Sequence, residues 1–368
     1  MDFDFSDEQY LLRDHARRFL DERCGSARVH RILDGAEPFD SALWRELAEL
    51  GWCGTAIPAE YGGQGAGYLE LCLLAEELGR VVAPVPFASS IYLAAELLLL
   101  AGSPAQRHAR LPVLASGDRI GTFALASVRA PAASGVRAQR GRLTGSVLPV
   151  PDGDIADFAI VCAHDADAGA SLYLVDTAQP GVGREALASI DPTRSQARLT
   201  FAGAEAEPLG APGAASTLAD AVCDRAAALI AFEQIGGAQR VLETASEYAK
   251  QRYAFGRPIG SFQAIKHMLA DMFVEVELAR SNCYYGAWAL AGAAPELAQA
   301  AAMAHIGASS AFLHCARQAV QIHGGIGFTW EMDCHLYFRR ANLLARALGN
   351  TRYWKSRLVD VLDRTGTI

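Results

Sequence analysis

Basic residues are scarce in this chain of 368 residues. It carries 33 lysines and arginines against 41 aspartates and glutamates, for a formal net charge of −8, and its only lysines are Lys250, Lys266 and Lys355. Nucleic-acid backbones and anionic membrane surfaces are bound through basic faces, so this balance argues against both kinds of partner. Apolar residues make up 51% and charged residues 20%, which suits a sizeable core and is atypical of disorder.

A long hydrophobic run is missing as well. The longest apolar stretch, from Ile91 to Gly102, is interrupted by Glu96 and is shorter than the roughly 20 residues that span a bilayer. The chain begins MDFDFSDEQY, with acidic residues where a secretory signal would have basic ones. We therefore expect a cytoplasmic protein without a membrane segment.

Metal-binding and disulfide patterns are also absent. No CxxC pair and no zinc-type spacing occurs among the eight cysteines, which we interpret as reduced core thiols: Cys24, Cys53, Cys72, Cys162, Cys223, Cys283, Cys315 and Cys334. Four histidines likewise show no ligand spacing and are interpreted as core or interface residues: His267, His305, His314 and His323. We predict no metal site.

The hydrophobic period divides the chain into three parts, with expected domains at 1–118, 119–206 and 207–368. Helical spacing predicts helices from the N-cap Ser6, from near Asp40, and over 69–80 and 91–100. Short runs broken by Gly, Pro and Asp predict strands over 120–126, 142–150, 158–163, 171–175 and 197–201. Alanine-rich segments predict long helices over 217–252, 262–292, 297–322 and 335–364.

These separate blocks indicate an α+β multidomain fold. It would comprise an N-terminal helical domain, a middle antiparallel β-barrel or sandwich, and a C-terminal four-helix bundle. A doubly wound sheet is excluded, because strands and helices would then alternate along the chain.

One segment with a chemical signature runs from Tyr248 to Asp271. A helix ends near Arg252, a Gly-Arg-Pro-Ile-Gly connection follows, and Ser261 is expected to cap a new helix with Gln263 in its first turn. A helix N-terminus beside an arginine suits a phosphate or pyrophosphate group. The alternative is a capped helix–turn–helix with a solvated arginine.

A second such segment, QIHGGIGFTWE, begins at Gln321. Its glycines allow a close backbone approach to a ligand or a left-handed conformation, and the alternative is a helix end and a turn. It is no dinucleotide fingerprint, since it follows a helix and not a strand.

Several motifs occur in the order in which acyl-CoA dehydrogenases carry them, and over nearly its whole length the chain resembles that family. The motifs are SDEQ, LWRELAELGWCG, IPAEYGGQG, AEELGRV, DPTR at 191–194, YAKQRYAFGRPIGSFQAIKHMLADM and QIHGGIGFTW. The resemblance implies the acyl-CoA dehydrogenase fold, FAD, an acyl-CoA substrate, an electron-transfer flavoprotein and an oligomer. It implies α,β-dehydrogenation, in which a carboxylate removes the α-proton and the β-hydride passes to the flavin.

The family shares each flavin between two subunits, and the half offered to the neighbouring subunit's flavin is intact here. By resemblance, Arg252, Phe255 and Gln263 would reach the pyrophosphate and adenosine side of that FAD. Gln321, Gly324 and Gly325 would lie behind its adenine end.

The motifs with which a subunit of the family binds its own flavin are replaced by other residues in this chain. A Thr-Glu-Pro and Gly-Ser-Asp signature of the family is replaced by Ala126, Ser127 and Val128, then Ala133, Ser134 and Gly135. A Trp-x-Thr that would cover the flavin ring aligns with Pro149 and Pro151, which offer neither an N–H nor a hydroxyl.

The expected catalytic glutamate is missing too. Its common position holds Leu348, and its alternative position in the family, on the helix before Arg252, holds Ala226. The acids near the latter are Asp224, two residues away on the wrong face, and Glu233, seven residues away on the same face but ~10 Å along the axis. Both are weak candidates for a base.

Three hypotheses follow. The chain is the smaller, non-catalytic subunit of a heteromeric acyl-CoA dehydrogenase, of the kind found in bacteria that degrade sterols or other bulky acyl chains. Alternatively, it is a homomeric acyl-CoA dehydrogenase with an atypical base, or a flavin-free structural or CoA-binding relative. The acyl chain cannot be read from any motif.

Overall fold

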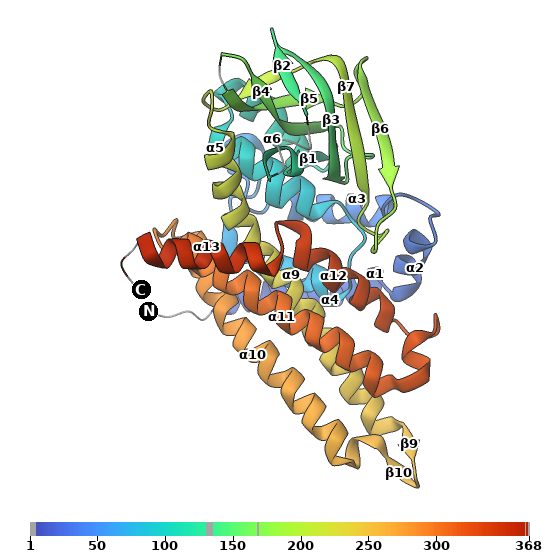
Figure 1. Ribbon diagram of the computed structural model, residues 1–368. Coiled ribbons are helices and arrows are strands. Elements are labelled where there is room, and N and C mark those ends of the chain that lie inside the picture. Colours follow the sequence, from blue (N-terminus) through green and yellow to red (C-terminus); the bar gives the residue numbers. More distant parts are fainter. Residues whose placement is uncertain (1–4, 130–134, 168, 365, 367–368) are drawn as a thin grey trace. The chain divides into compact units, whose positions relative to one another are not determined.

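The computed structural model describes residues 5–129, 135–167, 169–364 and 366. The chain divides into two compact units (Figure 1). Unit 1 comprises Met1–Val29, Tyr68–Ala83 and Ala227–Ile368, and unit 2 comprises His30–Gly67 and Pro84–Ala226. The three predicted domain boundaries remain a prediction.

Unit 1 is helical. Its helices are α1 (Asp7–Arg23), α4 (Tyr68–Arg80), the part of α9 (Ala215–Gln251) from Ala227 on, α10 (Gln263–Ala291), α11 (Leu297–His323), α12 (Cys334–Ala347) and α13 (Thr351–Arg364). The predicted start at Ser6 is confirmed: its hydroxyl accepts from the Gln9 N–H, while the Gln9 side chain accepts from the Ser6 N–H. The last of the four predicted bundle segments is two helices, because the chain breaks at Gly349, whose φ is 120°.

Helices α4 and α9 touch through glycine. A Cβ atom added to Gly79 would lie 1.9 Å from the Glu233 carbonyl oxygen, and one added to Gly236 would lie 1.9 Å from the Glu76 carbonyl oxygen. The two backbones are therefore so close that no side chain fits between them at either position.

Ion pairs with at least one buried member surround this contact. Three of them join α4 to its neighbours: Glu76–Arg280 at 2.6 Å, Glu77–Arg17 at 2.7 Å and Arg80–Glu243 at 2.7 Å. A fourth, Glu233–Arg340 at 3.2 Å, joins α9 to α12 with both side chains buried. Charges buried in this way need partners, because an isolated buried charge is costly.

Unit 2 combines helices with a sheet. Its helical elements are the end of α2 (Ser26–Leu33), α3 (Ser41–Glu49), η1 (Trp52–Gly54), η2 (Ala59–Tyr61), the π-helix η3 (Ala88–Ala95), α5 (Glu96–Ala101), α6 (Pro104–Ala115), α7 (Ala126–Arg129) and the start of α9. The Asp40 carboxylate accepts from the Leu43 N–H at 2.9 Å, which confirms the helix predicted near Asp40.

The strands form one sheet with the order β6-β7-β3-β2-β4-β5-β8, and β1 also pairs with β4. They are β1 (Gly121–Ala124), β2 (Arg137–Gln139), β3 (Arg142–Pro151), β4 (Phe158–Asp165), β5 (Gly169–Asp176), β6 (Val182–Leu187), β7 (Gln196–Glu205) and β8 (Glu207–Leu209). The core on one side of the sheet includes Val147, Val161, Val175 and Leu199.

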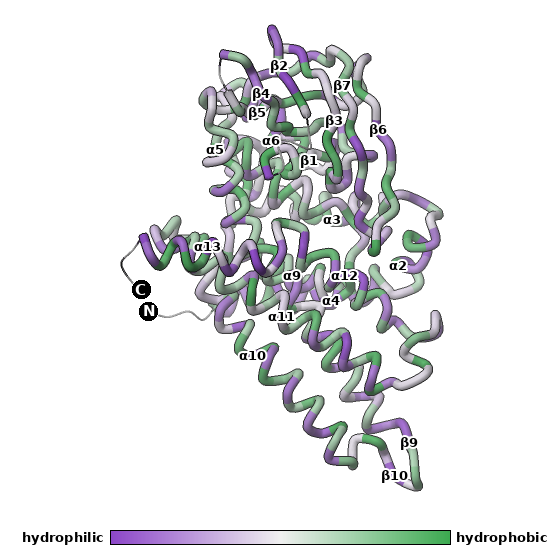
Figure 2. The backbone as a smooth tube through the Cα atoms, in the orientation of Figure 1, coloured by the Kyte–Doolittle hydropathy of each residue, from purple (hydrophilic) through white to green (hydrophobic). Residues whose placement is uncertain are grey.

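The sheet is open and mixed, not the closed antiparallel barrel that was one of the expectations. Strand β5 occupies one edge of β4 along its whole length, while β1 and β2 pair in parallel with successive stretches of the other edge. The chain leaves the sheet between them through α7, so these two strands share the direction of β4. Strand β2, purple in Figure 2, is short and hydrophilic.

The predicted fold class is confirmed: helical N-terminal and C-terminal regions flank a β-sheet region along the chain. All eight cysteines are buried and none of them forms a disulfide. Within the described residues, no helix combines the length and apolar character needed to cross a membrane.

We predict that Gly79→Ala destabilises the protein. Alanine is the better helix former by about 1 kcal/mol, but its methyl group would collide with the backbone of α9, and overpacking of this kind costs about 1–3 kcal/mol or more. Denaturant unfolding should therefore show a lower free energy of unfolding. Gly25→Ala is the matched control, since a Cβ atom there meets nothing within 4 Å. Wild-type stability of Gly79→Ala would contradict the close contact.

Candidate functional site

Arg252 lies beside the glycines of the second motif. It directly follows α9, and its carbonyl oxygen accepts from the Ile259 N–H at 2.7 Å, which folds the β9 (Tyr253–Ala254) and β10 (Arg257–Pro258) hairpin back on itself. A groove of about 440 Å³ is lined by Arg252 with Tyr248, Ile259, Ile322, His323, Gly324, Gly325 and Ile326. The structure thus brings together two segments about 70 residues apart that were singled out separately.

The glycines leave room on this groove. Gly324 ends α11 with φ 65° and ψ −141°, a conformation that side chains disfavour. A Cβ atom added to Gly324 or to Gly325 would meet nothing within 4 Å. Both glycines therefore present open backbone, and Arg252 supplies the positive charge that a phosphate group requires.

The other predicted cofactor residues are exposed but do not line this groove. Phe255 is 97% exposed at the hairpin turn, in edge contact with Phe262 at 6.2 Å. Gln263 is the first residue of α10, and Gln321 lies in the last turn of α11.

The predicted cap of α10 is wrong. The Ser261 hydroxyl donates to the Pro258 carbonyl at 2.7 Å, because the preceding residues form the short helix η4 (Ile259–Ser261). Phe262 is the N-cap and makes no side-chain capping bond. The first N–H groups of α10 therefore have no side-chain cap from their own N-cap residue.

Sequence reasoning missed a stacked pair in the groove. The rings of Tyr248 and His323 lie 4.2 Å apart at 27°, and the Tyr248 hydroxyl donates to the His323 carbonyl at 3.4 Å. A signal was present, since Tyr248 precedes Arg252 by one helical turn and therefore shares its face.

Neither expected base position holds an acid. Leu348 follows the end of α12 and is 1% exposed, and Ala226 is fully buried in α9. Asp224 is also buried, with 6% exposed.

Glu233 is held by Arg340. The Arg340 guanidinium lies 3.2 Å from the Glu233 carboxylate and also donates to the carbonyl oxygens of Val82, at 3.1 Å, and Ala83. Both charged side chains are almost completely buried. Removing one partner of such a pair costs about 3–5 kcal/mol, so Glu233 has a structural role that accounts for its carboxylate.

Ser127, one of the residues that replace the family's first flavin-ring signature, makes hydrogen bonds within the chain. The buried Ser127 hydroxyl donates to the Ala124 carbonyl at 2.6 Å and accepts from the Cys162 N–H at 2.8 Å. These bonds tie α7 to β1 and β4. Ala133 and Ser134 lie outside the described residues, and Gly135 has φ 57°.

The second replacement lies in β3. Pro149 and Pro151 have no N–H, and the Pro151 carbonyl accepts from the Thr122 hydroxyl. The next residue, Asp152, is buried and accepts from the Ser89 hydroxyl at 2.6 Å, and its burial raises the pKa of the carboxyl. These residues do not fit the role of hydrogen-bond donors to a flavin ring.

Comparison with known proteins identifies the family to which the chain is similar. Residues 6–118 match the acyl-CoA dehydrogenase N-terminal domain, and residues 217–360 match the acyl-CoA dehydrogenase C-terminal domain. The chain is 36% identical over 348 residues to the acyl-CoA dehydrogenase IpdE2 of Mycobacterium tuberculosis, with 94% of each protein covered.

Solved structures show the same fold. A chain of the ChsE4-ChsE5 complex from Mycobacterium tuberculosis superposes with a TM-score of 0.89 at 31% identity, covering 99% of both chains. A variant of the Tcur3481-Tcur3483 steroid ACAD gives a TM-score of 0.87 at 32% identity, covering 98% of this chain and 99% of that one. With its two matching domains and these relatives, the chain belongs to the acyl-CoA dehydrogenase family.

Proposed function

We propose that this protein is the non-catalytic subunit of a heteromeric acyl-CoA dehydrogenase. It supplies the pyrophosphate and adenosine side of an FAD site whose ring donors and catalytic glutamate belong to a partner subunit. The assembly carries out α,β-dehydrogenation of an acyl-CoA thioester in the cytoplasm and passes the electrons to an electron-transfer flavoprotein.

The observation that carries this proposal is that neither of the family's two base positions, both of which lie in the described part of the chain, holds an acid. A buried leucine occupies position 348, and leucine cannot accept a proton. The other acid considered in unit 1, Glu233, is committed to Arg340. A general base must reach the proton that it removes, and an ion-paired, fully buried carboxylate fixed between helices does not meet this requirement.

The chain's own flavin half supports the same proposal. Bound FAD would supply the hydride acceptor of the reaction, and its ring needs hydrogen-bond donors from the protein. The Ser127 hydroxyl donates to the Ala124 carbonyl, and Pro149 and Pro151 have no N–H to donate. We infer that this chain does not complete an FAD site of its own.

The residues expected to contact the FAD of a neighbouring subunit also support the proposal. Arg252, Gly324 and Gly325 line one groove, with charge and open backbone suited to pyrophosphate, and we assign Phe255, Gln263 and Gln321 to the same half-site. Two similar structures carry paired names, the ChsE4-ChsE5 complex and the Tcur3481-Tcur3483 steroid ACAD. We therefore propose a bulky, sterol-derived acyl group as the substrate class.

The first prediction concerns the acids near the alternative base position. In the reconstituted complex, Asp224→Asn and Glu233→Gln should each leave the turnover per folded complex within a few-fold of wild type, whereas removing a true general base costs ~10²-fold or more. The measurement is enoyl-CoA formation with an artificial electron acceptor, with folding checked by circular dichroism. Robust turnover by the unmixed wild-type chain, abolished by either substitution, would support a homomeric enzyme instead.

The second prediction concerns the half-site. A charge-assisted bond to pyrophosphate is worth about 1.5–3 kcal/mol, so Arg252→Ala should weaken FAD retention in the complex by roughly tenfold or more. The matched control is Arg257→Ala in the same hairpin, because Arg257 stacks on Phe262 at 4.1 Å and does not line the groove. Equal FAD retention in the two variants would remove Arg252 from the site.

A further inference from the structure

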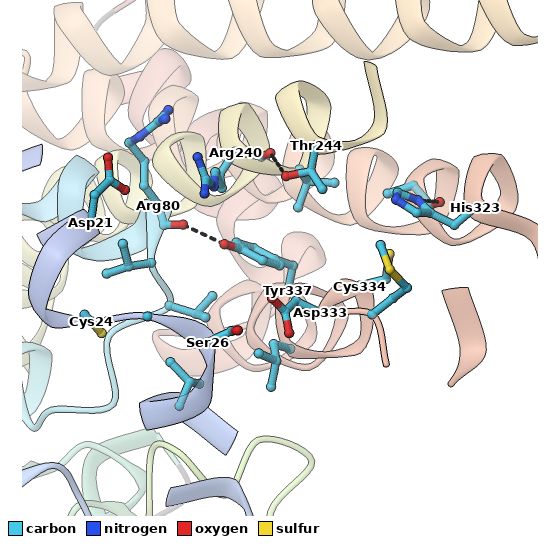
Figure 3. A pocket seen from close by; sticks show the side chains of 18 of the residues that line it. Asp21, Cys24, Ser26, Arg80, Arg240, Thr244, His323, Asp333, Cys334 and Tyr337 are labelled. Atoms are coloured by element: carbon cyan, nitrogen blue, oxygen red, sulfur yellow. Dashed lines mark hydrogen bonds between the residues drawn. The ribbon is translucent and has the colours of Figure 1, made fainter. Parts of the chain in front are cut away.

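A second cavity in unit 1, of about 260 Å³, has no role in the proposed function (Figure 3). It lies among α1, α4, α9, α11 and α12, and it shares His323 with the Arg252 groove. We propose that this cavity binds a small molecule with an apolar body, a hydroxyl or amide N–H that donates to His323, and a single carboxylate that faces Arg240.

His323 defines the donor that the ligand must carry. Its Nδ1 lies 2.7 Å from the Ala319 carbonyl oxygen, which can only accept, so the proton of the neutral ring sits on Nδ1. Its Nε2 is then a bare acceptor. The residue is 4% exposed, and Nε2 has no hydrogen-bond partner within the described residues. A buried polar atom in this state costs free energy that a donor from a ligand would recover.

Arg240 defines the charge. It lies two helical turns before Tyr248 on the same face of α9, at the exposed mouth of the cavity, and it forms no ion pair with a described carboxylate. Thr244, between them, turns its hydroxyl to the Arg240 carbonyl at 2.9 Å. Asp21, Glu331 and Asp333 also line the cavity, and their negative charge disfavours a ligand with several anionic groups.

The walls define the body of the ligand. Aliphatic side chains of α9, of α12 and of the turn after α4 contribute, among them Val241, Leu336 and Val81. Tyr337 adds its ring, because its hydroxyl already donates to the Arg80 carbonyl at 2.8 Å. Burial raises the pKa of this phenol, so it stays a neutral donor. An apolar body that covers these walls gains the usual free energy of removing apolar surface from water.

The wall at Val82 is held in a strained conformation. Val82 has φ 46°, in the left-handed region that a β-branched residue rarely adopts. Its carbonyl accepts from Arg340, which is fixed in turn by Glu233. The buried ion pair therefore positions one wall of the cavity, and strain of this kind persists where the surroundings enforce it.

The test uses a matched pair of probes on the purified full chain without FAD. Calorimetric titration with 3-(4-hydroxyphenyl)propionate should show saturable binding at one site per chain. 3-Phenylpropionate, which lacks the hydroxyl, should bind at least about fivefold more weakly, as expected for one lost hydrogen bond. Because no FAD is present, failure here is distinguishable from failure of the proposed function.

Variants locate the binding. His323→Phe keeps a ring to stack on Tyr248 and removes the acceptor, so it should abolish the preference for the hydroxylated probe. Arg240→Gln should weaken the binding of both probes, and Arg257→Ala should leave the affinity for both probes unchanged. The proposal is overturned if the wild-type chain shows no saturable binding, if it binds both probes equally, or if His323→Phe retains the preference. If His323→Phe fails to fold, the comparison of the two probes on the wild-type chain still tests the proposal.

Discussion

The backbone contact between α4 and α9 is the constraint on which unit 1 depends. Gly79 and Gly236 bring the two helices so close that each lies against a carbonyl of the other. Helices packed this tightly leave the charged side chains of α4 buried, and each then requires a partner from a neighbouring helix. Glu233, whose carbonyl lies against Gly79, takes Arg340 of α12 as its partner.

This arrangement has a direct consequence for catalysis. Glu233 pairs with Arg340, which links α9 to α12. Arg340 also donates to the carbonyls of Val82 and Ala83, so the pair reaches the turn that follows α4. Protonation of the Glu233 carboxylate would break this buried ion pair and destabilise the protein, so Glu233 is unsuited to act as a general base. Leucine occupies the other position, Leu348, so under the proposed function the base comes from a partner chain, while Arg252 and the adjoining glycines suit a neighbour's cofactor.

The features predicted from the sequence are those with local causes. Ser6 and Asp40 were identifiable as helix starts because capping depends on residues within one turn. Helix α6 could have been found in the same way, since Ser103, Pro104 and Gln106 form a capping box with proline at its first position. The parallel pairing of β1 and β2 with β4 was not predictable, because it depends on where the chain re-enters the sheet. Arg252 and the glycines were found from charge and composition, whereas the Tyr248–His323 stack and the Glu233–Arg340 pair join residues that are 75 and 107 positions apart.

Under the proposed function, this chain completes a partner's flavin site and has none of its own. The most direct measurement is the FAD content per chain, by flavin absorbance against protein concentration, of the chain purified alone and of the complex with its partner. We expect far less than one FAD per chain for the isolated protein and one FAD for every two chains in the complex. One FAD per chain in either preparation would contradict it.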